Sequence, residues 1–263
     1  MVKPHRSSAA RTRITRTLAA LAMIVAVNVA VIGCSNDNSE GLVDGVSDKY
    51  PLHTNITATT FWVGEILDPN ASDGSQVLST YDARWYESYG GCDGYIDEDG
   101  ACQTEARKAS NGFFPLNMTP LENPFYLDLP YDDINNEIGF ADRDRVIPWA
   151  GEKPYSDHVG DDRFSYMKNR WVAITRGDVT CYGQIQDAGP AEYSDADYVF
   201  GTDDRRPLNK KWRSAGLDVS PAINSCLGFP KLDYIEPVDW RFVDDADVPD
   251  GPWTEIITTS QVQ

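Results

Sequence analysis

Short segments in which apolar and polar residues alternate recur along the chain and predict β-strands, because successive strand residues face opposite sides of a sheet. The residues Arg-Gly-Asp at 176–178 separate two such segments and predict a tight turn between them, as in a β-hairpin. Gly189-Pro190 ends the second segment, since proline has no amide to donate to a ladder. The strands predicted in this way cover 56–65, 125–129, 171–175 and 179–186.

A short helix is predicted over 222–227. Ser220 is typical of a helix N-cap and Pro221 fits the first helical position. Gly228 is a common residue at the C-terminal end of a helix. By contrast, 132–162 is polar and punctuated by Gly and Pro, which predicts a loop.

A long elaboration over 66–124 interrupts the strand pattern. Four aromatic residues in it follow one another at nearly helical spacing: Tyr81, Trp85, Tyr86 and Tyr89. Aromatic side chains of this kind usually pack into a core, but they could also form a platform for sugar rings. Both interpretations are carried forward.

Candidate metal sites are weak. Asp97 and Asp99 match two positions of a calcium-binding loop, but Tyr95 and Ala106 occupy its first and last positions and offer no carboxylate. Asp157-His158 also lacks a recognisable ligand spacing, and no Cys-x-x-Cys pair is present, which disfavours zinc. We therefore predict no metal and no cofactor.

Charge narrows the class of partner. The chain has 263 residues and a formal net charge of -18, a length compatible with one elaborated domain. Nucleic acid is an unsuitable partner, because its phosphate backbone requires clustered basic residues. Neutral glycans, cationic ligands and divalent cations remain open.

The first 33 residues predict an export signal. They hold five basic residues and no acidic ones, and an apolar run follows that ends in Gly33-Cys34. This ending resembles a bacterial lipobox, so Cys34 is the expected lipidation site and 34–55 a flexible tether. The expected location is exported and lipid-anchored to the bacterial cell membrane or envelope; ordinary secretion, with Cys34 incidental, is the alternative.

The four remaining cysteines are Cys92, Cys102, Cys181 and Cys226. An even number outside the cytoplasm predicts two disulfides. Three connectivities are compatible with four cysteines.

Several motifs, taken in order, resemble the double-psi β-barrel family, which includes expansins, family-45-type endoglucanases and rare-lipoprotein-A-type lytic transglycosylases. Asp187-Ala188-Gly189-Pro190 is similar to the family's Asp-x-Gly-Pro turn, and Leu217-Asp218-Val219-Ser220 with Leu227-Gly228 to its Asp-Leu-Ser segment and short helix. The segments 59–64, 123–130 and 238–243 resemble three family strands. The resemblance implies an all-β fold, a six-stranded double-psi β-barrel over 56–263 with an insertion at about 66–124.

The resemblance also implies a function: binding of a cell-wall polysaccharide, peptidoglycan or β-glucan, in an expansin-like or weakly lytic manner. Asp218 would be the general acid, and Asp187 would tune or orient it. The implied pairing Cys181–Cys226 brackets these two motifs and leaves Cys92 to pair with Cys102. Candidate substrate contacts are Trp62, Glu65, Tyr182 and Trp212.

The chain departs from the family pattern in two places. Where the endoglucanases carry a catalytic base, this chain has Val63 and Gly64, and Glu65 is the nearest carboxylate. Gly216 stands where a cleft histidine is common. Hydrolysis by two carboxylates is therefore not expected, and whether the protein is an enzyme, either a lytic transglycosylase or endoglucanase-like, stays open. The alternative is a non-enzymatic interaction module, binding or inhibiting a protein partner. Asp187 and Asp218 would then be a turn residue and a helix-start residue.

Overall fold

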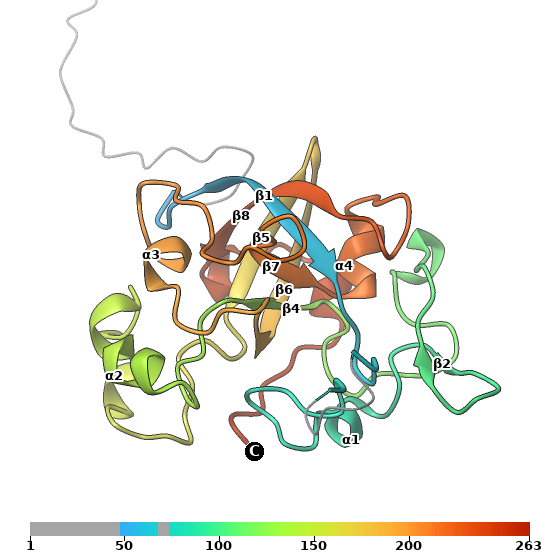
Figure 1. Ribbon diagram of the computed structural model, residues 1–263, viewed down its shortest axis with the longest axis horizontal. Coiled ribbons are helices and arrows are strands. Elements are labelled where there is room, and N and C mark those ends of the chain that lie inside the picture. Colours follow the sequence, from blue (N-terminus) through green and yellow to red (C-terminus); the bar gives the residue numbers. More distant parts are fainter. Residues whose placement is uncertain (1–47, 68–73) are drawn as a thin grey trace, which may run out of the picture. The chain divides into compact units, whose positions relative to one another are not determined.

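The computed structural model describes residues 48–67 and 74–263. The predicted signal segment, Cys34 and most of the predicted tether lie outside these ranges. In the described part the fold is all-β, with six strands closing a barrel, a separate two-stranded ribbon and four short helices (Figure 1). The barrel strands, in the order in which they are hydrogen-bonded, are β1 (His53–Thr60), β7 (Leu217–Val219), β4 (Tyr126–Leu129), β6 (Val179–Ala188), β5 (Trp171–Arg176) and β8 (Glu236–Val243).

The barrel mixes parallel and antiparallel pairs. β1 runs parallel to β7, and β4 runs parallel to β6, while the other neighbouring strands are antiparallel. The predicted hairpin is confirmed as β5 and β6 around the turn at Gly177. Each parallel pair requires a long connection. The other elements lie between the barrel strands along the chain. They are the ribbon strands β2 (Tyr95–Ile96) and β3 (Cys102–Gln103) and the helices α1 (Trp85–Tyr89), α2 (Glu137–Val146), α3 (Ala196–Val199) and α4 (Pro221–Cys226).

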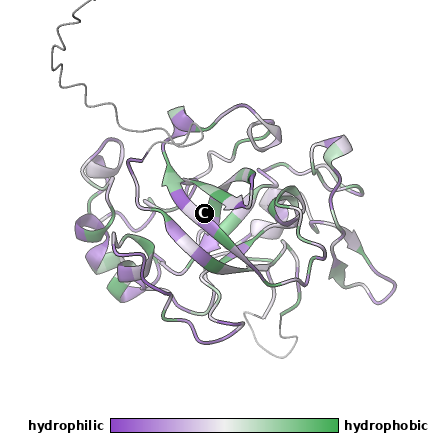
Figure 2. Cartoon of the chain, turned by 90° about the horizontal axis from the view of Figure 1, so that it is seen from above, coloured by the Kyte–Doolittle hydropathy of each residue, from purple (hydrophilic) through white to green (hydrophobic). Residues whose placement is uncertain are grey.

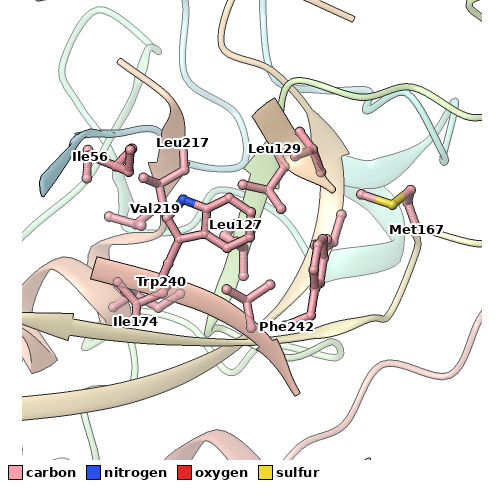
Figure 3. Close-up of a cluster of buried hydrophobic side chains, with 14 of the residues drawn as sticks. Ile56, Leu127, Leu129, Met167, Ile174, Leu217, Val219, Trp240 and Phe242 are labelled. Atoms are coloured by element: carbon pink, nitrogen blue, oxygen red, sulfur yellow. The ribbon is translucent and has the colours of Figure 1, made fainter. Parts of the chain in front are cut away.

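Alternate strand residues fill the inside of the barrel. Their side chains are buried and apolar, and Figure 3 labels nine members of this cluster, among them Trp240 at 0% exposure and Phe242 at 1%. Intervening residues are more polar, so hydropathy changes repeatedly along the strands in Figure 2. Burial of each large apolar side chain contributes about 2–3 kcal/mol, which makes this interior the main source of stability.

The strand predicted over 56–65 is displaced. β1 covers His53–Thr60, and Phe61 and Val63 leave the barrel to pack with Trp85, Tyr89 and Tyr126. Tyr81 is buried in the main core as well. Core packing is therefore confirmed for these aromatic residues of the insertion.

The prediction of a loop over 132–162 is wrong at α2. Asn136 caps this helix by accepting hydrogen bonds from the amides of Ile138 and Gly139. Gly139 allows the helix to approach the main chain of Asp132, because a Cβ at this position would lie 2.0 Å from the Asp132 carbonyl oxygen. Arg143 then secures the helix by donating to four backbone carbonyls, at Asp133, His158, Asp161 and Phe164.

Both predicted disulfides are present. Cys92–Cys102 closes the β2–β3 ribbon, and Cys181–Cys226 joins β6 to α4. The Cα atoms are 5.6 Å and 6.3 Å apart, respectively. Helix α4 itself begins as predicted, with the Ser220 hydroxyl accepting from the Ile223 amide and Pro221 in the first turn. None of the described helices has the length and apolar character needed to cross a membrane.

Candidate functional site

Three aspartates lie side by side on three neighbouring strands. Asp128 on β4 is paired with Asp187 on β6 and, on its other side, with Asp218 on β7. Thr59 on β1 continues this row, because it is paired with Asp218. Side chains directly opposite one another on a sheet have Cβ atoms about 5 Å apart, so the carboxyl groups form one cluster. We call Asp187, Asp128 and Asp218 the aspartate row.

Strand alternation places Asp128 and Asp218 on the outside of the barrel. Leu127 and Leu129 point into the core, as do Leu217 and Val219, so the aspartate between each pair faces outward. The Gly-Pro turn after β6 passes very close to Asp128. A Cβ at Gly189 would lie 2.8 Å from the Asp128 Oδ2, so the turn needs a residue without a side chain here.

Hydrogen bonds tie the row to the backbone. The Asp218 amide donates to Asp128 Oδ1 at 2.9 Å, and the Thr59 hydroxyl donates to Asp218 Oδ1. Asp187 Oδ1 accepts from the amides of Thr80 (2.7 Å) and Ala188 (2.8 Å). These bonds fix the three side chains in place, and Asp187 also touches the 76–83 segment of the insertion.

The carboxyl groups of the row hold protons more tightly than ordinary aspartates. Burial, with the charges of Asp218 and Asp187, raises the pKa of Asp128 well above its usual value. Burial raises the pKa of Asp187 to about 6, although the Thr80 amide opposes this. Burial and the charge of Asp187 raise the pKa of Asp218 to about 7. Asp128 and Asp187 are 4% and 6% exposed, whereas Asp218 is partly exposed, so solvent or a ligand can reach Asp218.

Glu65 adds a fourth carboxyl group. Its main chain pairs with that of Gln76, whose side-chain amide donates to Asp187 Oδ2 at 3.3 Å. Burial, opposed by the Trp62 amide and supported by the charge of Asp218, raises the pKa of Glu65 to about 8. Glu65 Oε2 is buried and has no hydrogen-bond partner among the described residues.

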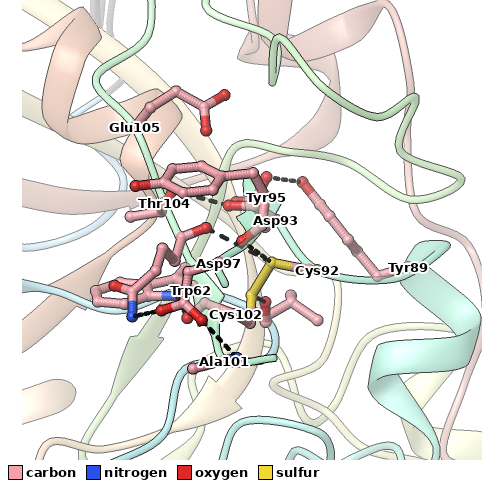
Figure 4. Close-up of a disulfide and its surroundings, with 12 residues drawn as sticks. Trp62, Tyr89, Cys92, Asp93, Tyr95, Asp97, Ala101, Cys102, Thr104 and Glu105 are labelled. Carbon is pink, nitrogen blue, oxygen red and sulfur yellow. Dashed lines mark hydrogen bonds between the residues drawn. A yellow bond between two sulfur atoms is a disulfide. The ribbon is translucent and has the colours of Figure 1, made fainter. Parts of the chain in front are cut away.

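The predicted aromatic contacts lie in different environments. Trp62 is partly exposed, and its ring nitrogen donates to the Cys102 carbonyl at 3.3 Å beside the disulfide (Figure 4). Trp212 is 53% exposed. Tyr182, only 5% exposed, packs against Trp253 with ring centroids 5.1 Å apart, in a cluster separate from the barrel core. The structure thus brings Glu65, Asp187 and Asp218 together and leaves Tyr182 covered.

The weak candidate metal sites have ordinary structural roles. Asp97 Oδ1 accepts from the amides of Asp99 and Ala101, as expected for a turn in the β2–β3 ribbon (Figure 4). His158 Nδ1 pairs with Asp161 at 2.9 Å. Among residues 48–67 and 74–263, no group of three or more potential ligands is arranged to hold a metal ion.

Sequence reasoning missed Asp128. Its segment Leu127-Asp128-Leu129 has the same pattern as Leu217-Asp218-Val219: one carboxyl residue between two core-facing residues. Comparing the two segments would have indicated that both aspartates face outward. No protein-family model and no curated protein matches this chain. The chemistry must therefore be argued from this cluster itself, which can hold and release protons near neutral pH.

Proposed function

We propose that this protein is a lipid-anchored envelope protein of the double-psi barrel type that binds a cell-wall polysaccharide and weakly cleaves it, with Asp218 as general acid. The closed mixed barrel is compatible with that fold. The observation that carries the proposal is Asp218 itself. It is partly exposed, it lies beside two buried aspartates, and its pKa is raised to about 7. A general acid works best when its pKa lies near the working pH.

Asp218 would give its proton to the glycosidic oxygen while the bond from that oxygen to the anomeric carbon breaks. A hydroxyl group then adds to the anomeric carbon and loses its proton, which restores the acid. Glycosidases commonly require such an acid with a raised pKa. The Thr59 hydroxyl donates to Asp218 Oδ1 and orients the carboxyl group.

Glu65 determines which kind of cleavage is favoured. With a pKa of about 8, its carboxyl group is mostly protonated at neutral pH and does not act as a base. Inverting hydrolysis needs an ionised carboxylate to activate water. Intramolecular attack by a hydroxyl of the sugar needs no activated water, so the cluster favours a lytic reaction over hydrolysis.

The first test is digestion of glycans by the full chain in detergent. Wild type, Asp218→Asn and the exposed-turn control Asp178→Asn are incubated with peptidoglycan and with β-glucan, and products are analysed by mass spectrometry. We expect fragments with anhydro-sugar ends from wild type and the control, and at least a 100-fold loss in Asp218→Asn, since general acids typically contribute about 10²–10⁴-fold.

Other outcomes separate the alternatives. Co-sedimentation of both wild type and Asp218→Asn with one glycan, without fragments, would limit the function to expansin-like binding. Reducing ends formed by water would contradict the lytic reaction. Absence of both binding and release would remove the glycan proposal and leave the non-enzymatic interaction module.

A further inference from the structure

A cavity of about 400 Å³ opens on the barrel surface where the chain enters β8. Its lining comes from one loop before β7 and from the segment that enters β8: Arg213, Asp233, Tyr234, Ile235, Glu236 and Pro237. The size falls within the range of roughly 300–1,000 Å³ that is usual for sites that bind small ligands. None of these residues belongs to the aspartate row.

Strand register relates the cavity to Asp218. On β1, Thr57 is paired with Pro237 of the cavity, and Thr59 is paired with Asp218. Thr57 and Thr59 face the same side of β1 because they are two residues apart, a rise of about 7 Å. Pro237 and Asp218 lie on the two opposite neighbours of β1, two strand spacings of about 4.8 Å apart, so the cavity begins roughly 12 Å from the proposed acid, or about two sugar units, on the same outer face.

The loop that brings Arg213 to the cavity has an unusual backbone. Trp212, Arg213 and Ser214 follow one another with φ values of 46°, 58° and 59°, in the left-handed region. The Arg213 carbonyl accepts a hydrogen bond from the Thr57 hydroxyl at 3.2 Å. Non-glycine residues in this region cost stability and cluster at ligand-binding sites. The loop is thus held against β1 in a conformation that places Arg213 at the cavity.

The cavity offers both hydrogen-bond donors and acceptors. Within the described part of the chain, neither Arg213 nor Asp233 forms an ion pair or side-chain hydrogen bond, and Tyr234 is 43% exposed. Glu236 is already paired with Arg176 at 3.3 Å. A sugar ring has hydroxyl groups that both donate and accept, and apolar faces that stack on aromatic rings.

Charge decides between classes of sugar. An acidic sugar could form an ion pair with Arg213. It would also lie close to the side chains of Asp233 and Glu236, in a protein whose formal net charge is -18. Like charges at close range disfavour binding. We propose that this cavity is a subsite for an uncharged sugar unit, about two units away from the bond that Asp218 would protonate, with Tyr234 as the stacking face. This inference rests on the proposed function and specifies its substrate class.

Binding to soluble oligosaccharides tests the subsite. The full chain in detergent, with Asp218→Asn to prevent turnover, is titrated by calorimetry with hexamers of β-1,4-glucose, β-1,4-N-acetylglucosamine and galacturonate. We expect binding of an uncharged hexamer and a Kd at least tenfold weaker after Tyr234→Ala. Tyr234→Phe, which keeps the ring, should stay within about twofold. Arg213→Gln and Asp233→Asn should each weaken binding about threefold or more, because each replaces charge-assisted hydrogen bonds to hydroxyl groups by weaker neutral ones.

Three results would overturn the inference. Stronger binding of the galacturonate hexamer would assign the cavity to acidic sugars. Unchanged affinity of Tyr234→Ala for the hexamer that binds would move the sugar elsewhere, and Asp218-dependent cleavage of glycans would then leave the proposed function intact. If no hexamer binds and no glycan is cleaved, the subsite and the proposed function fail together.

Discussion

At the scale of single residues, the three members of the aspartate row lie in different local contexts along the chain. Asp187 precedes a Gly-Pro turn and Asp218 precedes a capped helix, so each lies at a signal that can be recognised from neighbouring residues. Asp128 has no such signal. Its importance comes from the barrel register, which pairs it with both other aspartates across long intervals of sequence.

The charge of Asp187 gives the clearest test of coupling within the row. Asp187→Asn removes a negative charge near Asp218, while its side-chain oxygen can still accept from the amides of Thr80 and Ala188. Because a nearby like charge raises the pKa of a carboxyl group, we expect the Asp218 pKa to fall from about 7 by about one unit. Carboxyl ¹³C NMR titration measures this shift without depending on activity.

The control for this titration is Asp178→Asn, in the exposed turn between β5 and β6. It removes the same charge at a position outside the row and should leave the Asp218 titration unchanged. An equal shift in both variants would mean that net charge, and not the proximity of Asp187, determines the Asp218 pKa.

At the scale of elements, local signals predicted the strands and α4 well but missed α2. The helix sequence is largely polar and has no apolar stripe. Its stability comes from the Asn136 cap and from Arg143, whose carbonyl partners lie up to 21 residues away. Such partners are brought together only by the tertiary fold, so no local sequence pattern predicts them.

The C-terminal segment 258–263 acts as a strap beside the row. Thr258 exchanges hydrogen bonds with the Gln184 side chain on β6 (2.9 and 3.1 Å), and the Ser260 carbonyl accepts from Asn169 at 2.9 Å. Gln263 then pairs with the main chain of Tyr81 and Ala83. Both residues closely follow Thr80, whose amide donates to Asp187, so the strap supports one side of the site.

Removal of residues 259–263 should therefore have two effects. The free energy of unfolding should fall by about 3 kcal/mol, because several hydrogen bonds worth about 1 kcal/mol each are lost. Hydrogen exchange at the Thr80 amide should become at least tenfold faster, since the residues that follow it lose their partners. Urea unfolding and amide exchange measure the two effects; unchanged Thr80 exchange at reduced stability would limit the strap to a general stabilising role.

At the scale of the whole molecule, folding buries several carboxyl groups on and around the barrel, and burial raises their pKa values. Among them are Asp187 and Asp133 (to about 6), Asp218 (to about 7) and Glu65 (to about 8). The folded state then binds more protons than the unfolded chain between about pH 4 and pH 8. Stability falls with rising pH wherever the folded state holds the extra protons. The sequence showed the net charge, but burial of particular carboxyl groups depends on the completed fold.

His53 opposes this trend over part of the range. Burial lowers its pKa to about 4, so below pH 6.5 the unfolded chain binds a proton that the folded state does not, and stability rises with pH from about 4 to 6.5. Four raised carboxyl groups outweigh one histidine in that interval. Between pH 6.5 and 8.5 His53 no longer affects the pH dependence of stability. The loss of stability as Asp218 and Glu65 release their protons is then not offset by His53.

We therefore expect the free energy of unfolding to fall by about 1–2 kcal/mol between pH 6.5 and pH 8.5. Full linkage at about 1.4 kcal/mol per pKa unit would give about 3 kcal/mol, and the partial exposure of both groups reduces this value. Urea unfolding of the full chain at both pH values, with disulfides intact, measures the fall. The double variant Asp218→Asn and Glu65→Gln should remove most of it, because neither amide titrates. A fall of equal size in the double variant would place the titrating groups outside this cluster, and with them the proton that the proposed acid needs.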